Sequence, residues 1–242
     1  MRSGNPVLKS ETFDAAFTGE RMTINGTINK TAILLSLCLI TAIYTWGLFY
    51  TSKDPATIMP YVWVGGIGGF ALAILTVIKL EWVAITAPIY ALVEGLLVGG
   101  VSAMFEVKYP GIVLQAVFLT FGTMACMLVA YRTGLIKATE NFKLGVVAAT
   151  GGIFLLYIVS FVLSFFGIHI GFIHEGGTFG ILFSVFVVVI AALNLVLDFD
   201  FIREGVEQGA PKKMEWYGAF ALTVTLVWLY LEILRLLGKL RK

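Results

Sequence analysis

The sequence predicts an all-α, polytopic membrane protein with seven transmembrane helices. Hydrophobic residues make up 59% of the 242 residues and charged residues only 13%, whereas a soluble domain is about half apolar and one quarter charged. The apolar residues form seven runs of roughly twenty residues, the length at which a helix crosses about 30 Å of hydrocarbon. The connections between these runs are short. We therefore expect one compact bundle without a separate soluble domain.

A polar N-terminal arm, residues 1–30, precedes the first apolar run and lacks the apolar core of a signal peptide. Residues 31–242 form the predicted transmembrane domain, with spans at 31–50, 58–79, 82–104, 111–131, 144–167, 178–200 and 216–237. The second and third spans contain the glycine pairs Gly65/Gly69 and Gly95/Gly99, whose spacing lets helix backbones approach closely. These glycines indicate helix contacts or, alternatively, a glycine-lined pathway.

Lysine and arginine residues predict the orientation in the membrane. The arm and the connections on its side carry 11 basic residues, and the connections on the other side carry two. Because cytoplasmic loops carry the excess of basic residues, we expect a cytoplasmic N-terminus. The last four basic residues, Arg235, Lys239, Arg241 and Lys242, fall outside if the final segment crosses the membrane and inside if it re-enters. The charge pattern leaves both topologies open.

Acidic side chains within the apolar runs are the candidate functional residues. Asp198 and Asp200 lie at the end of the sixth span, Glu232 and Arg235 lie within the seventh, and Glu94 lies in the third. Carboxylates are costly in hydrocarbon, so they usually face the interior of a bundle or a water-filled cavity. We expect Glu94 either to line a pathway or to hold neighbouring helices together.

Structural interpretations of the other charged residues remain open. Glu232 and Arg235 are three residues apart, so they could form a local ion pair on one helix face. Asp198 and Asp200 could be solvated carboxylates at a helix end, and they point in different directions on a helix. Lys79, at the end of the second span, could balance the charge of Asp198 or anchor the span at the interface.

Two motifs in the last third of the chain resemble the transmembrane Bax inhibitor motif family. The sixth span ends in Asp198-Phe-Asp-Phe-Ile202, and the final span contains Leu229-Tyr-Leu-Glu232. The resemblance covers about residues 30–242. The N-terminal RSGNPVL and the loop GAPKKMEWYGAF are similar to a bacterial branch, which implies the bacterial inner membrane. A glutamate in place of the family's second aspartate and a longer 201–215 loop are departures from the family pattern.

The resemblance implies a pH-sensitive calcium leak channel whose last helix is surrounded by the other six. In that family, an aspartate on each of the last two spans shares a proton and controls opening; Asp198 matches the first and Glu232 the second. Two adjacent carboxylates cannot both ionise cheaply, and losing the shared proton would free oxygen ligands for Ca²⁺. Calcium is then the transported ion, and no cofactor is expected.

The predicted pair imposes a geometric condition on the final helix. A helix crossing directly from residue 216 would place Glu232 about 24 Å deeper than Asp198, because each residue rises ~1.5 Å. The pair therefore requires residues 215–221 to lie at the interface, with the span at 222–240, or a sixth span that sits deeper. We favour the first arrangement, which leaves Arg235 and Lys239 able to extend to the interface.

A second functional interpretation is a regulator that binds a membrane-bound protease or another membrane protein through the N-terminal arm. In that case the acidic residues within the spans would have a structural role only. No nucleophile–base pair, phosphate loop, haem ligand set or zinc spacing is visible, so we do not expect an enzyme. The 17 basic residues cluster at the ends of the apolar runs, so we expect no nucleic-acid partner. His169, His174 and Glu175 could hold a transition metal, but we interpret them as residues of a loop near the interface.

Overall fold

The computed structural model describes residues 20–167 and 177–241, and within these ranges seven stretches of helix are long and apolar enough to cross a membrane. The predicted number of spans is confirmed. The helices are α2 (Ile24–Ser52), α3 (Pro55–Trp63) continued by the π-helix η1 (Val64–Gly68) and α4 (Gly69–Ile78), the 3₁₀ turn η2 (Leu80–Trp82) continued by α5 (Val83–Lys108), α6 (Ile112–Arg132), α7 (Glu140–Phe165), α9 (Thr178–Glu207) and α10 (Met214–Leu240).

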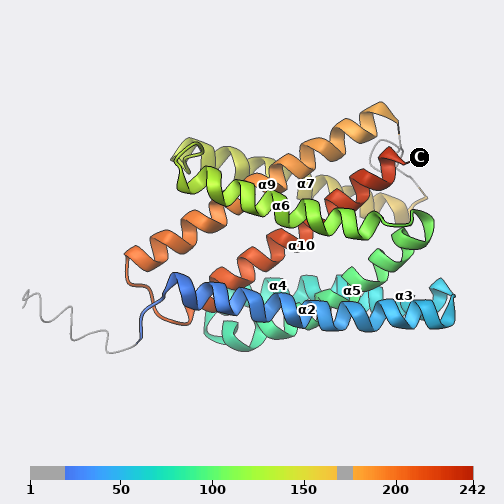
Figure 1. The fold of residues 1–242 in the computed structure, drawn as a ribbon, viewed down its shortest axis with the longest axis horizontal. Coiled ribbons are helices and arrows are strands. Elements are labelled where there is room, and N and C mark those ends of the chain that lie inside the picture. Colours follow the sequence, from blue (N-terminus) through green and yellow to red (C-terminus); the bar gives the residue numbers. More distant parts are fainter. Residues whose placement is uncertain (1–19, 168–176, 242) are drawn as a thin grey trace, which may run out of the picture.

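The last helix, α10, is central, as predicted. It contacts α2, α5, α6 and α9, and Figure 1 shows it running between α2–α5 on one side and α6, α7 and α9 on the other. Gly218 near its start packs against Ile202, and Lys239 near its end donates to the Gly180 carbonyl at the start of α9. The helix therefore extends along the whole of α9, so the final segment crosses the bundle and does not re-enter. Residues 215–221, which we predicted to lie at the interface, form the first turns of this continuous helix.

Residues 20–23 bind the connection between α9 and α10. The Met22 amide donates to the Ala210 carbonyl at 2.7 Å, and the Lys212 amide donates to the Glu20 carbonyl at 2.9 Å. The side chains of Glu20 and Lys212 also form an exposed ion pair. The Glu20 carboxylate raises the pKa of the Lys212 ammonium above its ordinary value. Two segments almost two hundred residues apart are thus joined at one end of the bundle.

This contact changes the predicted boundary of the N-terminal arm. The Thr23 hydroxyl accepts a hydrogen bond from the Gly26 amide, a typical N-cap, and α2 begins at Ile24. Residues 24–30 therefore belong to the first transmembrane helix and not to the arm. Residues 1–19 of the predicted arm lie outside the described part of the chain.

Helices α2 and α5 pack with their backbones in close contact. Gly95 and Gly99 of α5 lie against the carbonyl oxygens of Cys38 and Ala42 of α2, and a Cβ atom at either glycine would overlap those oxygens. This is the close approach that small residues four apart permit. The predicted helix contact is confirmed for this glycine pair.

Replacing Gly99 with alanine should destabilise the bundle by about 1–3 kcal/mol, because the added methyl group forces two backbones apart. The unfolding free energy, measured by denaturant titration in detergent, tests this expectation. Gly47→Ala on α2 is the control, since a Cβ at Gly47 meets no neighbouring atom within 4 Å. Equal stability of the two variants would contradict the close contact.

Candidate functional site

Asp198 lies beside a cavity between α4, α9 and α10. Its carboxyl group faces Thr225 of α10. The Oδ2 atom is buried and has no hydrogen-bond partner among the described residues. The cavity has a volume of about 410 Å³ and is otherwise lined mainly by apolar side chains, among them Ala73, Val77 and Phe220. Asp198 is thus a buried acceptor whose hydrogen-bonding capacity is only partly used.

Glu232 is held in an ion pair that also involves α7. Its side chain is 2% exposed. Its Oε1 atom accepts hydrogen bonds from the Tyr157 hydroxyl and from Arg235 Nη1, each at 2.9 Å. The Arg235 guanidinium also donates to the Tyr157 hydroxyl at 2.7 Å and lies 5.2 Å from the centre of the Tyr157 ring. The local ion pair suggested by the sequence is therefore confirmed, with a tyrosine from a second helix added.

The structure does not bring Asp198 and Glu232 together. Asp198 lies opposite Thr225, and Glu232 is seven residues further along α10, a rise of about 10 Å. The sixth helix continues to Glu207, so Asp198 sits deeper than a span ending at residue 200 would place it. The greater depth shortens the separation of about 24 Å without producing contact. The predicted proton-sharing pair is absent from this conformation of the described chain.

Asp200 belongs to a different cluster, on the side of α9 that faces α6 and α7. It is 5% exposed. It accepts a hydrogen bond from the Tyr131 hydroxyl at 2.7 Å and pairs with Lys143 at 2.8 Å. Lys143 also pairs with Glu204 at 2.9 Å. The prediction that Asp198 and Asp200 point in different directions is confirmed. The idea that Asp200 is a solvated helix-end carboxylate is wrong, since it is buried and paired.

Glu94 is buried against the start of α4. Its Oε2 atom lies where a Cβ atom on Gly69 would have to be, and the π-helix η1 ends one residue before that glycine. Irregular turns of this kind occur often at functional sites. Gly69 is one helical turn from Ala73, which lines the cavity of Asp198. Lys79 is exposed at the end of α4 and forms no ion pair with Asp198, so its position fits an anchor.

The sequence did not indicate two other buried charges of α10. Glu215 is 1% exposed, pairs with Lys30 of α2 and accepts hydrogen bonds from Thr23. Lys239 was expected to extend to the interface, but it is 4% exposed and donates to Ser184 Oγ at 2.9 Å. No local signal links Lys30 to Glu215, because they are 185 residues apart.

A preformed metal site is absent from the described ranges. No group of three or more His, Cys, Asp or Glu side chains there could hold an ion, whereas Ca²⁺ takes about six to eight oxygen ligands. Asp198 and Glu232 therefore do not form the predicted calcium site in this conformation. His169, His174 and Glu175 lie outside the described residues.

The seven apolar helices and the buried charges between them define a polytopic integral membrane protein. The model of the family described as "Bax inhibitor 1 like" matches residues 5–242, and the chain belongs to this family. The family assignment confirms the resemblance carried by the motifs at Asp198 and Glu232. Comparisons with curated proteins and with solved structures find no match.

The Glu232–Arg235–Tyr157 cluster predicts a strong asymmetry between single and double variants. Arg235→Met should destabilise the protein by up to about 3 kcal/mol, because it leaves Glu232 buried without its cation. Adding Glu232→Gln should restore much of that loss, because no buried charge then remains. Denaturant titration of the two variants in detergent measures both effects.

Lys212→Met is the control for this series. It breaks the ion pair between Lys212 and Glu20, whose side chains are 51% and 74% exposed. Exposed ion pairs contribute little to stability, so the cost should be small beside that of Arg235→Met. If Arg235→Met and Lys212→Met cost the same, the buried cluster contributes nothing special to stability.

Proposed function

We propose that the protein is a pH-sensitive leak channel for cations, with Ca²⁺ as the transported ion, and that Asp198 is its proton-sensing group. The observation that carries this proposal is the buried Oδ2 atom of Asp198, which has no partner among the described residues and borders a cavity. Removing a proton from a carboxyl group there costs free energy, because no donor or cation faces the oxygen. Proton loss therefore favours a rearrangement that brings water or a cation to Asp198.

Glu94 is the second acidic group we assign to the route. It lies against Gly69, one turn of α4 from the Asp198 cavity. The rings of Tyr90 and Phe220 lie close by, packed edge to face with centroids 5.0 Å apart. The π-helix before Gly69 is a point at which the second span can change shape. Movement of this segment would connect the two carboxyl groups, which offer the oxygen ligands that hard cations prefer.

Glu232 has a different role in this proposal from the one that the family pattern implied. Its carboxylate pairs with Arg235 and accepts a hydrogen bond from Tyr157, and it does not contact Asp198. We assign it to positioning α10 against α7. The proton-dependent step then rests on Asp198 and not on a carboxylate pair.

The remaining parts of the proposal concern the membrane in which the protein lies, its orientation there and its functional class. We propose a cytoplasmic N-terminus, because basic residues are concentrated on the side of the N-terminal arm. We propose the bacterial inner membrane as the location, because the segments RSGNPVL and GAPKKMEWYGAF resemble a bacterial branch of the family. The Asp198 cavity then opens toward the cytoplasmic half of the bundle, since Tyr217, close to the contact with residues 20–23, also lines it. We propose a conducting protein and not an enzyme.

Calcium uptake into liposomes containing the pure protein tests the function. We expect flux above that of empty vesicles, rising several-fold from about pH 6 to about pH 8 as Asp198 loses its proton. Asp198→Asn should remove this pH dependence, because an amide cannot titrate in this range. Glu94→Gln should lower the flux at every pH while leaving its pH dependence in place.

Glu207→Gln is the matched control on the same helix, since Glu207 is exposed, and it should behave as wild type. Unaltered pH dependence in Asp198→Asn would remove Asp198 from the sensing role. No flux at any pH would contradict the channel and favour the regulator hypothesis. Deletion of residues 1–19 then tests that hypothesis, because it should abolish binding of a membrane-protein partner.

A further inference from the structure

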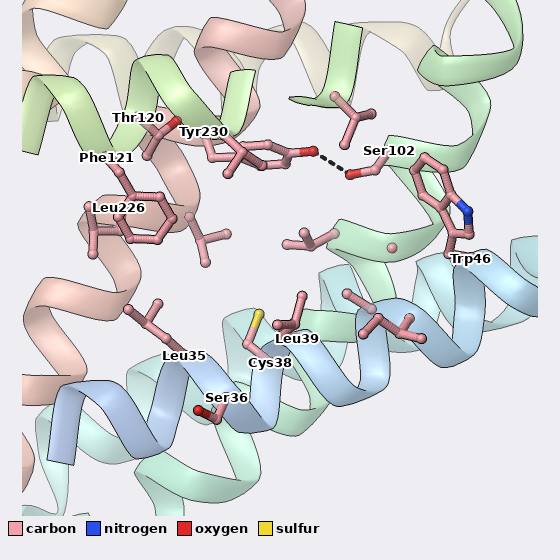
Figure 2. Close-up of a pocket in the computed structure, with 17 residues that line it drawn as sticks. Leu35, Ser36, Cys38, Leu39, Trp46, Ser102, Thr120, Phe121, Leu226 and Tyr230 are labelled. Carbon is pink, nitrogen blue, oxygen red and sulfur yellow. Dashed lines mark hydrogen bonds between the residues drawn. The ribbon is translucent and has the colours of Figure 1, made fainter. Parts of the chain in front are cut away.

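A second, larger cavity lies on the other side of the central helix, between α2 and α6. Its volume is about 720 Å³, within the range of small-molecule sites. Helix α2 packs on α5 and α10, and α6 packs on α9 and α10, so α2 and α6 stand apart. Figure 2 shows the resulting space; Leu35, Leu39 and Trp46 of α2, Phe121 of α6 and Tyr230 of α10 are among the residues around it.

The cavity offers its occupant almost no polar group. No charged side chain lines it. The hydroxyls of Ser102 and Tyr230 are bonded to each other at 2.6 Å, as Figure 2 shows, and the Thr120 hydroxyl donates to the Ala116 carbonyl. The hydroxyl of Ser36 is likewise used within its own helix. Because cavities of this kind stay dry, the cavity suits an apolar occupant and not an ion or water.

The position and length of the cavity identify the occupant. Leu39 and Ile43 line it while being 59% and 61% exposed, so it opens sideways toward the surrounding lipid. Along α2 it extends from Leu35 to Trp46, a rise of about 16 Å. One leaflet of the hydrocarbon core is about 15 Å thick, half of ~30 Å. The cavity is therefore as long as one acyl chain in a leaflet.

We propose that this cavity binds one acyl chain of a membrane phospholipid, which enters between α2 and α6 from the leaflet where α2 ends and α6 begins. Acyl chains are the molecules present at this depth. An unfilled space of this size forfeits dispersion contacts along its whole lining. The headgroup remains at the membrane surface, because no charged side chain lines the cavity and its hydroxyl groups are already hydrogen-bonded. The bound chain packs against Leu226, Val227 and Tyr230 of α10.

Native mass spectrometry of the full-length protein tests this site. The protein is incubated with vesicles of palmitoyl-oleoyl phosphatidylethanolamine and extracted in a mild detergent that removes loosely bound lipid. We expect one phospholipid to remain per wild-type protein. Val117→Phe, which fills the cavity from α6, should reduce the occupancy about tenfold. Leu114→Phe, on an exposed part of α6 that does not line the cavity, should leave it unchanged.

A second pair of variants probes the opposite wall. Leu39→Phe projects into the cavity from α2, whereas its neighbour Ile40 is equally exposed but does not line it, so Ile40→Phe is the control. Thermal unfolding identifies any variant that fails to fold. If a variant on one helix fails, the lining and control variants on the other helix still test the site. Loss of the phospholipid only in the lining variants supports the site. Equal retention in lining and control variants overturns it, and so does an adduct of detergent or free fatty acid alone.

Discussion

The central helix carries three acidic or basic side chains that are almost fully buried, and each has a partner from another part of the bundle. Glu215 pairs with Lys30 of α2, Glu232 is bonded by Tyr157 of α7, and Lys239 donates to the start of α9. An unpaired charge in a low-dielectric interior costs several kcal/mol. These contacts therefore fix the rotation and the axial position of α10 against three neighbouring helices, and the cavities on its two sides follow from that position.

Asp198 departs from this pattern. The other buried acids of α9 and α10 have cations or hydroxyl donors facing them, whereas one oxygen of Asp198 has no donor within the described structure. The fold gives its other buried charges partners but leaves one carboxyl oxygen, Asp198 Oδ2, without a hydrogen-bond donor. Local inconsistencies of this kind are expected at functional sites. The same reasoning separates Asp198 from Glu232. The two residues match the two carboxylate positions of the family pattern, yet of the two only Asp198 has a buried oxygen without a hydrogen-bond partner in the described structure.

The sequence was sufficient to predict the number of spans, because the length of an apolar run reflects the thickness of the membrane. Helical spacing also offered the Glu232–Arg235 ion pair as one of two interpretations of Glu232, and the structure contains it. The sequence could not give the register between α9 and α10, because that depends on how far α9 continues beyond Asp200. The pairing of Lys30 with Glu215 and the π-helix before Gly69 were likewise invisible, since each results from packing between distant segments.

The two cavities lie on opposite faces of α10, so the proposed lipid site and the proposed proton-sensing group would be coupled through this helix. Tyr217, Val224 and Thr225 border the Asp198 cavity, whereas Leu226 and Tyr230 border the apolar one. A shift of α10 that enlarges one cavity therefore narrows the cavity on its other face. If the acyl chain binds more tightly to one position of α10, loss of the Asp198 proton must change lipid affinity by the same factor as lipid changes proton affinity. A protein of this design would respond to pH and to the composition of its membrane through one helix.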